Sequence, residues 1–191
     1  MTYEEDYGLD SFSRKWLLVL LQLSDSRGDK KTDILRINKI FRYFEHLLDQ
    51  NHLDFSNYNL GAVSYELRET VDELEEYDLI TEDHGKYQLT SEGEKAEKEM
   101  LANLSKQEIK MLEFSKKLLN DMSDDELLFF MYMTFPQTQE HSTQITRLLR
   151  KKEELVTSLY NKGKITTATA SKWMEISESD FLKTHRIQLS A

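Results

Sequence analysis

The sequence of 191 residues contains no cysteine, one proline and six glycines. The absence of cysteine excludes disulfides, thiolate metal sites and cysteine nucleophiles. The scarcity of proline and glycine favours helices joined by short loops, because these two residues interrupt helices most strongly. Hydrophobic residues make up 39% of the chain. This is enough to form a packed core and argues against disorder.

The chain also lacks a hydrophobic run long enough to cross a bilayer. Its longest apolar run extends only from Trp16 to Leu21, whereas a spanning helix needs about 20 apolar residues. Residues 1–10 are acidic and polar, unlike the basic and then apolar start of a signal peptide. We therefore expect a cytoplasmic protein that makes no membrane contact.

Patterns that mark catalytic or cofactor sites are absent as well. The five histidines show no metal-binding spacing on one helix, and the scattered glycines cannot form a phosphate-binding loop. No Gly-x-Ser-x-Gly nucleophile elbow occurs. We expect a protein that is not an enzyme, with no catalytic residue, no metal and no cofactor. Its function should therefore be binding.

Charge of one sign dominates the first half of the chain. Residues 1–104 hold 12 Lys and Arg against 23 Asp and Glu, whereas residues 105–191 hold 13 against 12. The formal net charge of the whole chain is −10. An acidic N-terminal half repels nucleic acid at long range.

The hydrophobic pattern of the first half predicts three helices, a β-hairpin and a further helix. We expect the three helices over about residues 13–23, 31–50 and 62–77, with a loop at 57–61. The run from Trp16 to Leu21 is apolar all round and should lie at the centre of the core. Residues 79–90, LITEDHGKYQLT, predict two short strands around a turn at 83–85, and Ser91 can cap the next helix.

This order of elements, and the segment LEEYDLITEDHGKYQLTSEGEKAEKEM, resemble prokaryotic winged-helix regulators over residues 12–104. Tyr87, Leu89, Thr90 and Gly93 match the wing strand and the start of the helix that follows it. The resemblance implies a winged-helix domain with a small two-stranded wing. Residues 58–80 show a looser resemblance to Panacea-type antitoxin domains, although the usual Gly-Pro is Gly61-Ala62 here.

The second half predicts helices throughout, and we place the domain boundary between the regions 1–104 and 105–191. Ser123 and Glu126 have the spacing of a capping box, and Pro136 should end the helix that they open. One long helix is expected over about 142–160. The predicted fold class is mainly α: a winged-helix domain followed by an all-helical C-terminal region that ends in a short helix-turn-helix.

The C-terminal segment 153–183 resembles a small helix-turn-helix family of antitoxin-like proteins. The matching residues are Leu159, Tyr160, Lys162, Gly163, Lys164, Ile165, Phe181 and Leu182. The family prefers small alanines where this chain has Ser171, Lys172 and Trp173. The resemblance implies a two-helix unit that associates with DNA.

The third predicted helix carries the wrong charge for a DNA groove. In winged-helix proteins that bind DNA this helix usually enters the major groove, yet residues 62–77 hold six acids and Arg68 as the only base. Phosphates would repel this face, so we expect it to face solvent or a protein partner. The candidate interface residues are Glu69, Asp72, Glu73 and Glu76.

One further interface candidate, Lys152, interrupts the apolar stripe of the predicted helix 142–160. It either extends along the helix to solvent or pairs with a carboxylate of another helix or subunit. Cations that could contact phosphate lie in the second helix, the wing and the C-terminal region. They are Lys39, Arg42, Lys86, Arg147, Arg150, Lys151, Lys162, Lys164 and Lys172.

Two hypotheses follow from these patterns. In the first, the protein is a DNA-associated regulator, transcription-regulator-like or antitoxin-like, that contacts duplex DNA through basic residues of the C-terminal region or of the second helix. In the second, it is an adaptor that presents its acidic third helix to a basic protein partner and does not bind DNA. The two resemblances favour the first hypothesis, and the charge of the third helix favours the second. The aromatic and apolar residues at 129–135 cannot all face inward on one helix, so we expect them to pack in the core or, as the second interpretation, against another copy of the chain. A homodimer is the expected oligomeric state under both hypotheses.

Overall fold

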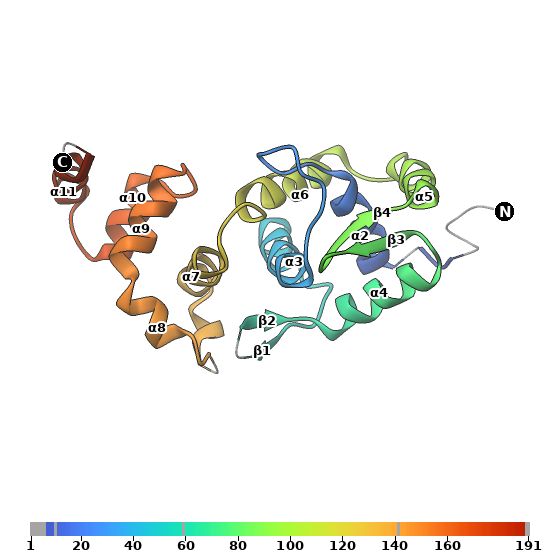
Figure 1. The fold of residues 1–191 in the computed structure, drawn as a ribbon, viewed down its shortest axis with the longest axis horizontal. Helices are drawn as coiled ribbons and strands as arrows, with labels where there is room; N and C mark the ends of the chain where they lie inside the picture. The colour runs from blue at the N-terminus through green and yellow to red at the C-terminus, as the bar shows by residue number, and fades with distance from the viewer. Residues whose placement is uncertain (1–6, 10, 59, 141, 190–191) are drawn as a thin grey trace. The chain divides into compact units, whose positions relative to one another are not determined.

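The computed structural model describes residues 7–9, 11–58, 60–140 and 142–189. Most of the acidic N-terminal tail, His141, and the side chains of Tyr58 and of residues 185–189 lie outside the described part. The described chain is mainly helical and contains two small two-stranded sheets (Figure 1), which confirms the expected fold class at this level. It divides into two compact units, the first formed by residues 1–56 and 62–121, the second by residues 57–61 and 122–191.

The helices and strands follow one another in the order that Figure 1 shows. The first unit contains the helices α2 (Phe12–Gln22), α3 (Ile34–Leu48), α4 (Tyr65–Glu76), α5 (Ser91–Leu101) and α6 (Lys106–Leu119), and the strands β3 (Ile80–Asp83) and β4 (Lys86–Leu89). A hairpin of β1 (Ser56–Tyr58) and β2 (Gly61–Val63) precedes α4. The second unit contains α7 (Asp124–Thr134), the 3-10 helix η1 (Pro136–Gln139), α8 (Ile145–Arg150), α9 (Lys152–Asn161), α10 (Thr167–Met174) and α11 (Glu178–Leu189).

Helix α2 forms the centre of the first unit. Every residue from Trp16 to Leu21 is at most 4% exposed, because α2 packs against α4, α5, α6 and strand β4. The prediction that this all-apolar run lies in the core is therefore confirmed. The N-terminus of the helix is capped by Ser11, whose hydroxyl accepts a hydrogen bond from the Arg14 amide.

Strands β3 and β4 form the predicted antiparallel hairpin, with Ile80 opposite Leu89 and Asp83 opposite Lys86. His84 and Gly85 both have positive φ angles, of 53° and 76°, as a tight two-residue hairpin turn requires. Thr32, in the connection between α2 and α3, exchanges backbone hydrogen bonds with Tyr87 of β4. This bridge ties the hairpin to the helices.

Helix α6 packs along α3 within the first unit. Asn120, which follows its last residue, holds the connection between α2 and α3. Its Nδ2 donates to the buried Asp25 carboxylate at 3.0 Å, and its Oδ1 accepts a hydrogen bond from the Thr32 hydroxyl. The Asp25 carboxylate also accepts two backbone N–H bonds of its own loop. Because Thr32 bridges β4, α6 helps to fix the position of the hairpin.

The second unit is built on the apolar helix α7. Ser123 and Glu126 form the predicted capping box at its start, and the helix ends at Thr134, two residues before Pro136. The Trp173 ring of α10 packs edge-on against the rings of Phe129 and Phe130, each with centroids 5.8 Å apart. Part of the aromatic cluster of α7 is thus covered within its own unit.

The expected single helix over 142–160 is wrong, because the structure contains two helices that meet at Lys151. This residue has φ −101° and ψ 14°, outside the α-helical region. Leu148 and Leu155 are nevertheless both buried. The apolar spacing therefore continues across the break, which is why the pattern predicted one helix.

Candidate interaction surfaces

Helix α4 has one apolar and one acidic face. Leu67, Thr70, Val71 and Leu74 are buried against the first unit. The acidic face is formed by Glu66, Glu69, Asp72, Glu73, Glu75 and Glu76, which alternate with the buried positions at helical spacing. Of these six, Glu73 is partly buried and the other five are exposed.

Arg14 of α2 neutralises one carboxylate of this acidic face. Its guanidinium donates from Nε and Nη2 to the same Glu73 oxygen, at 2.9 and 2.8 Å. The negative field of the remaining carboxylates reaches the hairpin, where the pKa of Tyr87 is raised by burial and then by the charges of Glu75, Glu82 and Asp72. The predicted interface residues Glu69, Asp72 and Glu76 are thus exposed, whereas the Glu73 carboxylate is paired with Arg14 of the same unit.

The cations around the hairpin have carboxylate partners. Lys86 lies 3.7 Å from Asp29, and Lys31 donates to Asp83 at 2.5 Å. His84 also contacts Asp83, and these hydrogen bonds hold the pKa of that carboxyl below its usual range. The hairpin therefore offers phosphate no cluster of free positive charge among the described residues.

The two basic candidates of α3 occupy different environments. Lys39 is fully buried, and its ammonium donates to the backbone oxygen of Ala62 at 2.7 Å. Burial lowers the pKa of Lys39 to about 8. Lys39, one of the predicted phosphate contacts, therefore lies in the interior of the first unit and cannot reach a phosphate in this structure. Arg42 is half-buried and lies over the Phe55 ring, 5.7 Å from its centroid.

A second lysine, Lys116 of α6, is also fully buried. Its ammonium donates to the backbone oxygens of Leu20 and Lys30, at 2.8 and 2.6 Å. Burial lowers the pKa of Lys116 to about 7, although the charges of Asp25 and Asp29 act in the opposite direction. Both buried lysines thus donate to backbone oxygens of other segments of the first unit, a role that the charge pattern did not predict.

In the second unit, Arg147 and Lys151 share one carboxylate. The Arg147 guanidinium donates from Nη1 and Nη2 to the two carboxylate oxygens of Asp125, at 2.8 and 2.6 Å. The Lys151 ammonium donates to one of the same oxygens at 3.1 Å. The hydrogen bonds from Arg147, opposed by partial burial and reinforced by Lys151, lower the pKa of Asp125 to about 2. Both predicted phosphate contacts are therefore engaged with Asp125.

Glu126 is the other acidic centre of the second unit, and it is 3% exposed. Lys162 donates to both of its carboxylate oxygens at 2.7 Å, and Ser158 donates to one of them at 2.6 Å. The sequence identified Glu126 only as a helix cap. Its partners lie 32 and 36 residues away, a separation at which no sequence spacing indicates contact.

The remaining C-terminal cations differ in exposure and pairing. Lys152 is partly exposed, and its ammonium lies 2.9 Å from the Glu175 carboxylate of its own unit, so its carboxylate partner lies on the same chain. Lys164 is half-buried. Arg150 and Lys172 are exposed, and neither forms an ion pair with any residue that the structure describes.

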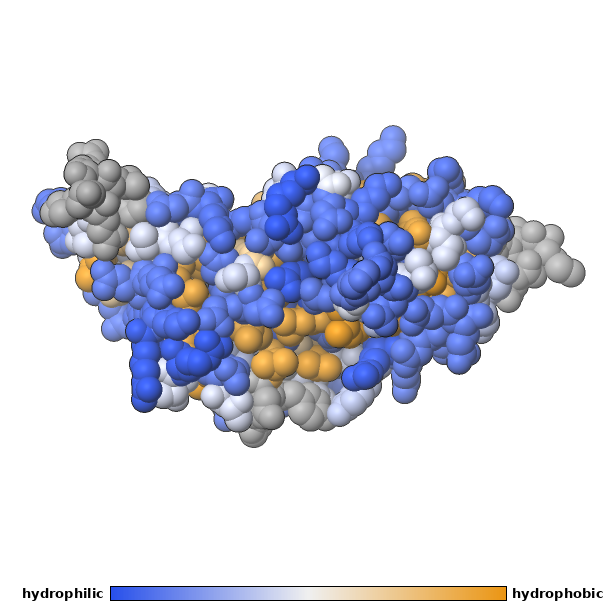
Figure 2. Space-filling model, viewed as in Figure 1, coloured by the Kyte–Doolittle hydropathy of each residue, from blue (hydrophilic) through white to orange (hydrophobic). Residues whose placement is uncertain are grey.

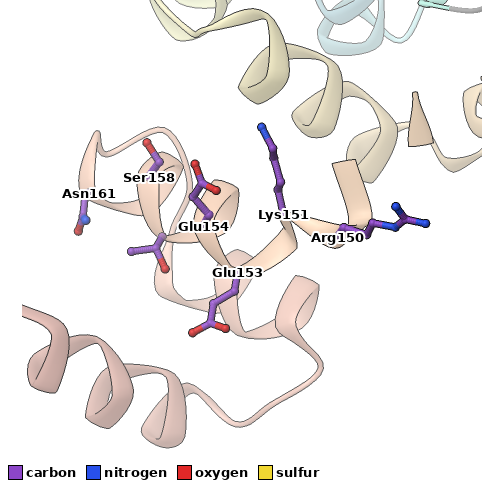
Figure 3. Close-up of a pocket in the computed structure, with 7 residues that line it drawn as sticks. Arg150, Lys151, Glu153, Glu154, Ser158 and Asn161 are labelled. Atoms are coloured by element: carbon purple, nitrogen blue, oxygen red, sulfur yellow. The ribbon is translucent and has the colours of Figure 1, made fainter. Parts of the chain in front are cut away.

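One surface hollow in each unit is lined by charged and polar side chains. The larger, of about 590 Å³, follows α8 and α9 and is lined by Arg150, Lys151, Glu153, Glu154, Thr157, Ser158 and Asn161. Figure 3 shows that the labelled side chains point in different directions and do not converge on one point. The smaller, of about 190 Å³, lies between the start of α2 and α4.

The described residues contain no group of three or more His, Cys, Asp or Glu side chains that could hold a metal ion. Each of their helices is too short or too polar to cross a membrane. Hydrophilic residues cover most of the face drawn in Figure 2.

No protein-family model and no curated protein matches the chain.

Proposed function

We propose that this protein is a non-catalytic adaptor, built on a winged-helix domain over residues 12–104, that binds a basic protein partner through the acidic face of α4. The order of α2, α3, α4, the β3–β4 hairpin and α5 supports the winged-helix assignment. The Thr32–Tyr87 bridge supports it further, since it joins the hairpin and the helices into one body.

The observation that carries the proposal is the charge of α4, the helix that enters the major groove in DNA-binding winged-helix proteins. Its exposed face holds carboxylates with Arg68 as the only cation. DNA carries one negative charge per about 1.7 Å of helix axis, so this face would be strongly repelled. The same charges attract a basic protein surface and speed its association.

The state of the candidate cations also favours an adaptor. Lys39 is buried, while Lys86, Arg147, Lys151 and Lys162 lie beside carboxylates of their own unit. A phosphate that displaced these carboxylates would leave them without partners. The net gain in binding free energy would then be small.

A second candidate function, a DNA-associated regulator, is favoured by one feature of the second unit. Helix α10 packs against both α9 and α11. Glu175 ends α10 in the left-handed conformation, with φ 60° and ψ 36°. This tight turn between two short helices supports the predicted helix-turn-helix. The exposed cations Arg150 and Lys172 lie in the same unit.

Titration of a fluorescein-labelled 30-base-pair duplex separates the two functions. At low salt, about 50 mM, we expect no saturable change in fluorescence anisotropy with the intact chain, because phosphate contacts are strongest there and still too few. Saturable binding would contradict the adaptor proposal. If that binding were abolished by R150E/K172E but kept by the equally charged control K106E/K110E on α6, it would establish the second candidate.

A further inference from the structure

The buried end of Lys116 lies where α6 meets the end of α2 and the connection between α2 and α3. Its Nζ donates to the backbone oxygens of Leu20 and Lys30, at 2.8 and 2.6 Å, and the side chain is fully buried. Lys116 forms no ion pair with any residue that the structure describes. An ammonium has three N–H donors, whereas a neutral amine has two. The two acceptors therefore match the neutral amine and leave the third proton of the charged form unpaired.

The connection that Lys116 holds, residues 23–33, also positions the β3–β4 hairpin. Thr32, near its end, exchanges backbone hydrogen bonds with Tyr87 of β4, and its hydroxyl donates to Asn120. Lys116 and Asn120 stand about one helical turn apart at the end of α6. A change at Lys116 can therefore reach the hairpin through a short polar segment.

The charges nearest to Lys116 do not provide it with a counter-ion. Asp25 and Asp29 act on it from the connection and favour its charged form, whereas Lys30 opposes them. The Asp25 carboxylate is already bonded to Asn120 and to two amides of its own loop. Burial outweighs both carboxylates and lowers the pKa of Lys116 to about 7.

The elements packed around this site carry further charged groups, each engaged with an opposite charge. They are Arg27 with Asp25, Lys31 with Asp83 of β3, Lys86 of β4 with Asp29, Arg36 of α3 with Asp33, Lys117 of α6 with Glu113, and the buried Glu97 of α5, whose pKa is raised by burial against the charges of Lys98 and Lys30. Helix α2 presents its apolar run here. Of all these groups, Asp25, Asp29 and Lys30 act on Lys116.

We propose that the connection 23–33 is a proton-operated latch, closed by the neutral amine of Lys116 and opened when that amine binds a proton. The added proton brings a buried charge and an N–H without an acceptor, and both are costly. Turning the connection away from α6 lets water hydrate the ammonium and separates Thr32 from Tyr87. Proton binding thus loosens the hairpin from the helices. This device goes beyond the adaptor function and does not depend on it.

The pH range of the latch follows from the pKa of Lys116 in its two states. This pKa is about 7 in the closed state and about 10.4 for a hydrated lysine, so opening takes up a proton between these two values. The open fraction therefore rises as pH falls toward 7 and changes little below it. It should increase roughly fiftyfold from pH 9 to pH 7, and only about twofold from pH 7 to pH 6.

Trypsin cleavage of the intact chain measures the opening, because Arg27, Lys30 and Lys31 lie in the connection. At low protease concentration the cleavage rate follows the open fraction. Each rate is divided by that of a free peptide of residues 22–34 at the same pH, and mass spectrometry identifies the first cut. We expect the normalised rate to increase roughly fiftyfold from pH 9 to pH 7. K116M should reduce this increase to less than about twofold, whereas the control K39M, which removes the other buried lysine, should keep it.

NMR of the intact chain labelled with ¹³C at lysine Cε reports the proton directly. The Lys116 signal, assigned by its absence from K116M, should titrate with a midpoint near pH 7. A midpoint above about pH 10 would overturn the neutral amine. Cleavage of the unmodified chain that does not change with pH, or an unchanged pH dependence in K116M, would overturn the latch. The midpoint and the cleavage profile are both measured on the unmodified chain, with K116R assigning the signal if K116M does not fold.

Discussion

Replacing Gly93 by alanine is expected to destabilise the first unit by about 3 kcal/mol, the upper range for overpacking. An added Cβ at Gly93 would lie 1.9 Å from the backbone oxygen of Leu79 and 2.9 Å from its carbonyl carbon. That oxygen already accepts a hydrogen bond from the Thr90 amide at 3.0 Å, and the Gly93 amide donates to the Thr90 hydroxyl at 3.0 Å. Both sides of the clash are therefore fixed backbone, and α5 would have to move away from Leu79, the residue before β3.

The two tryptophans make this effect measurable, because Trp16 lies in the first unit and Trp173 in the second. Urea unfolding followed by Trp16 fluorescence in a W173F background should show a much lower midpoint for Gly93→Ala. The control S91A changes an exposed position of the same helix and should shift the free energy of unfolding by no more than about 0.5 kcal/mol. An unchanged midpoint in Gly93→Ala would show that the start of α5 does not approach the Leu79 backbone this closely.

Replacing Glu126 by glutamine is expected to cost the second unit about 2 kcal/mol at neutral pH. The carboxylate accepts bonds from Lys162, Ser158 and the Ser123 amide. Truncating one side of a buried pair costs about 3–5 kcal/mol. The expected cost is lower here because the Lys162 side chain is 44% exposed, so its ammonium can be hydrated when the carboxylate is removed. Trp173 fluorescence in a W16F background measures the change, and E154Q on the exposed face of α9 is the control.

The same substitution changes the pH dependence of stability. Burial alone would raise the pKa of Glu126, but the hydrogen bonds from Lys162, Ser158 and the Ser123 amide outweigh it and hold the pKa below its usual range. A carboxyl with a lowered folded-state pKa stabilises the fold above its unfolded-state value and loses this contribution as pH falls through the folded-state value. The difference between the unmodified chain and Glu126→Gln should therefore be full at pH 7 and shrink below about pH 4. A difference that stayed constant down to pH 3 would show that Glu126 is not held as an ionised pair.

Local patterns predicted much of the architecture because the relevant signals lie close together in the sequence. The run from Trp16 to Leu21, the hairpin turn at His84–Gly85 and the capping box at Ser123 each span a few residues. The break at Lys151 could not be predicted, because the apolar positions keep their spacing across it. The sequence predicts only a loop over 57–61 where the structure has the hairpin β1–β2, because strands of three residues are too short to show an alternating pattern.

The candidate surfaces were predictable only where their residues lie on one helix, because contacts between distant segments leave no local pattern in the sequence. The acidic face of α4 follows from its spacing on one helix, and the structure exposes most of it. Lys39 stands among polar-face positions in the sequence, and only the approach of Ala62 explains its burial. The pairing of Asp125 with Arg147 joins residues 22 positions apart, and the hollow at Thr70 needs α2 and α4 together. Tertiary packing creates these features.

The central claim is that the exposed face of α4 binds protein and not DNA. Two-dimensional amide NMR of the intact chain tests it directly, with a basic peptide and a DNA duplex added in separate titrations at low salt. We expect the amide signals of α4 to shift with the peptide and to stay in place with the duplex. Shifts of α4 signals with the duplex, and none with the peptide, would contradict it.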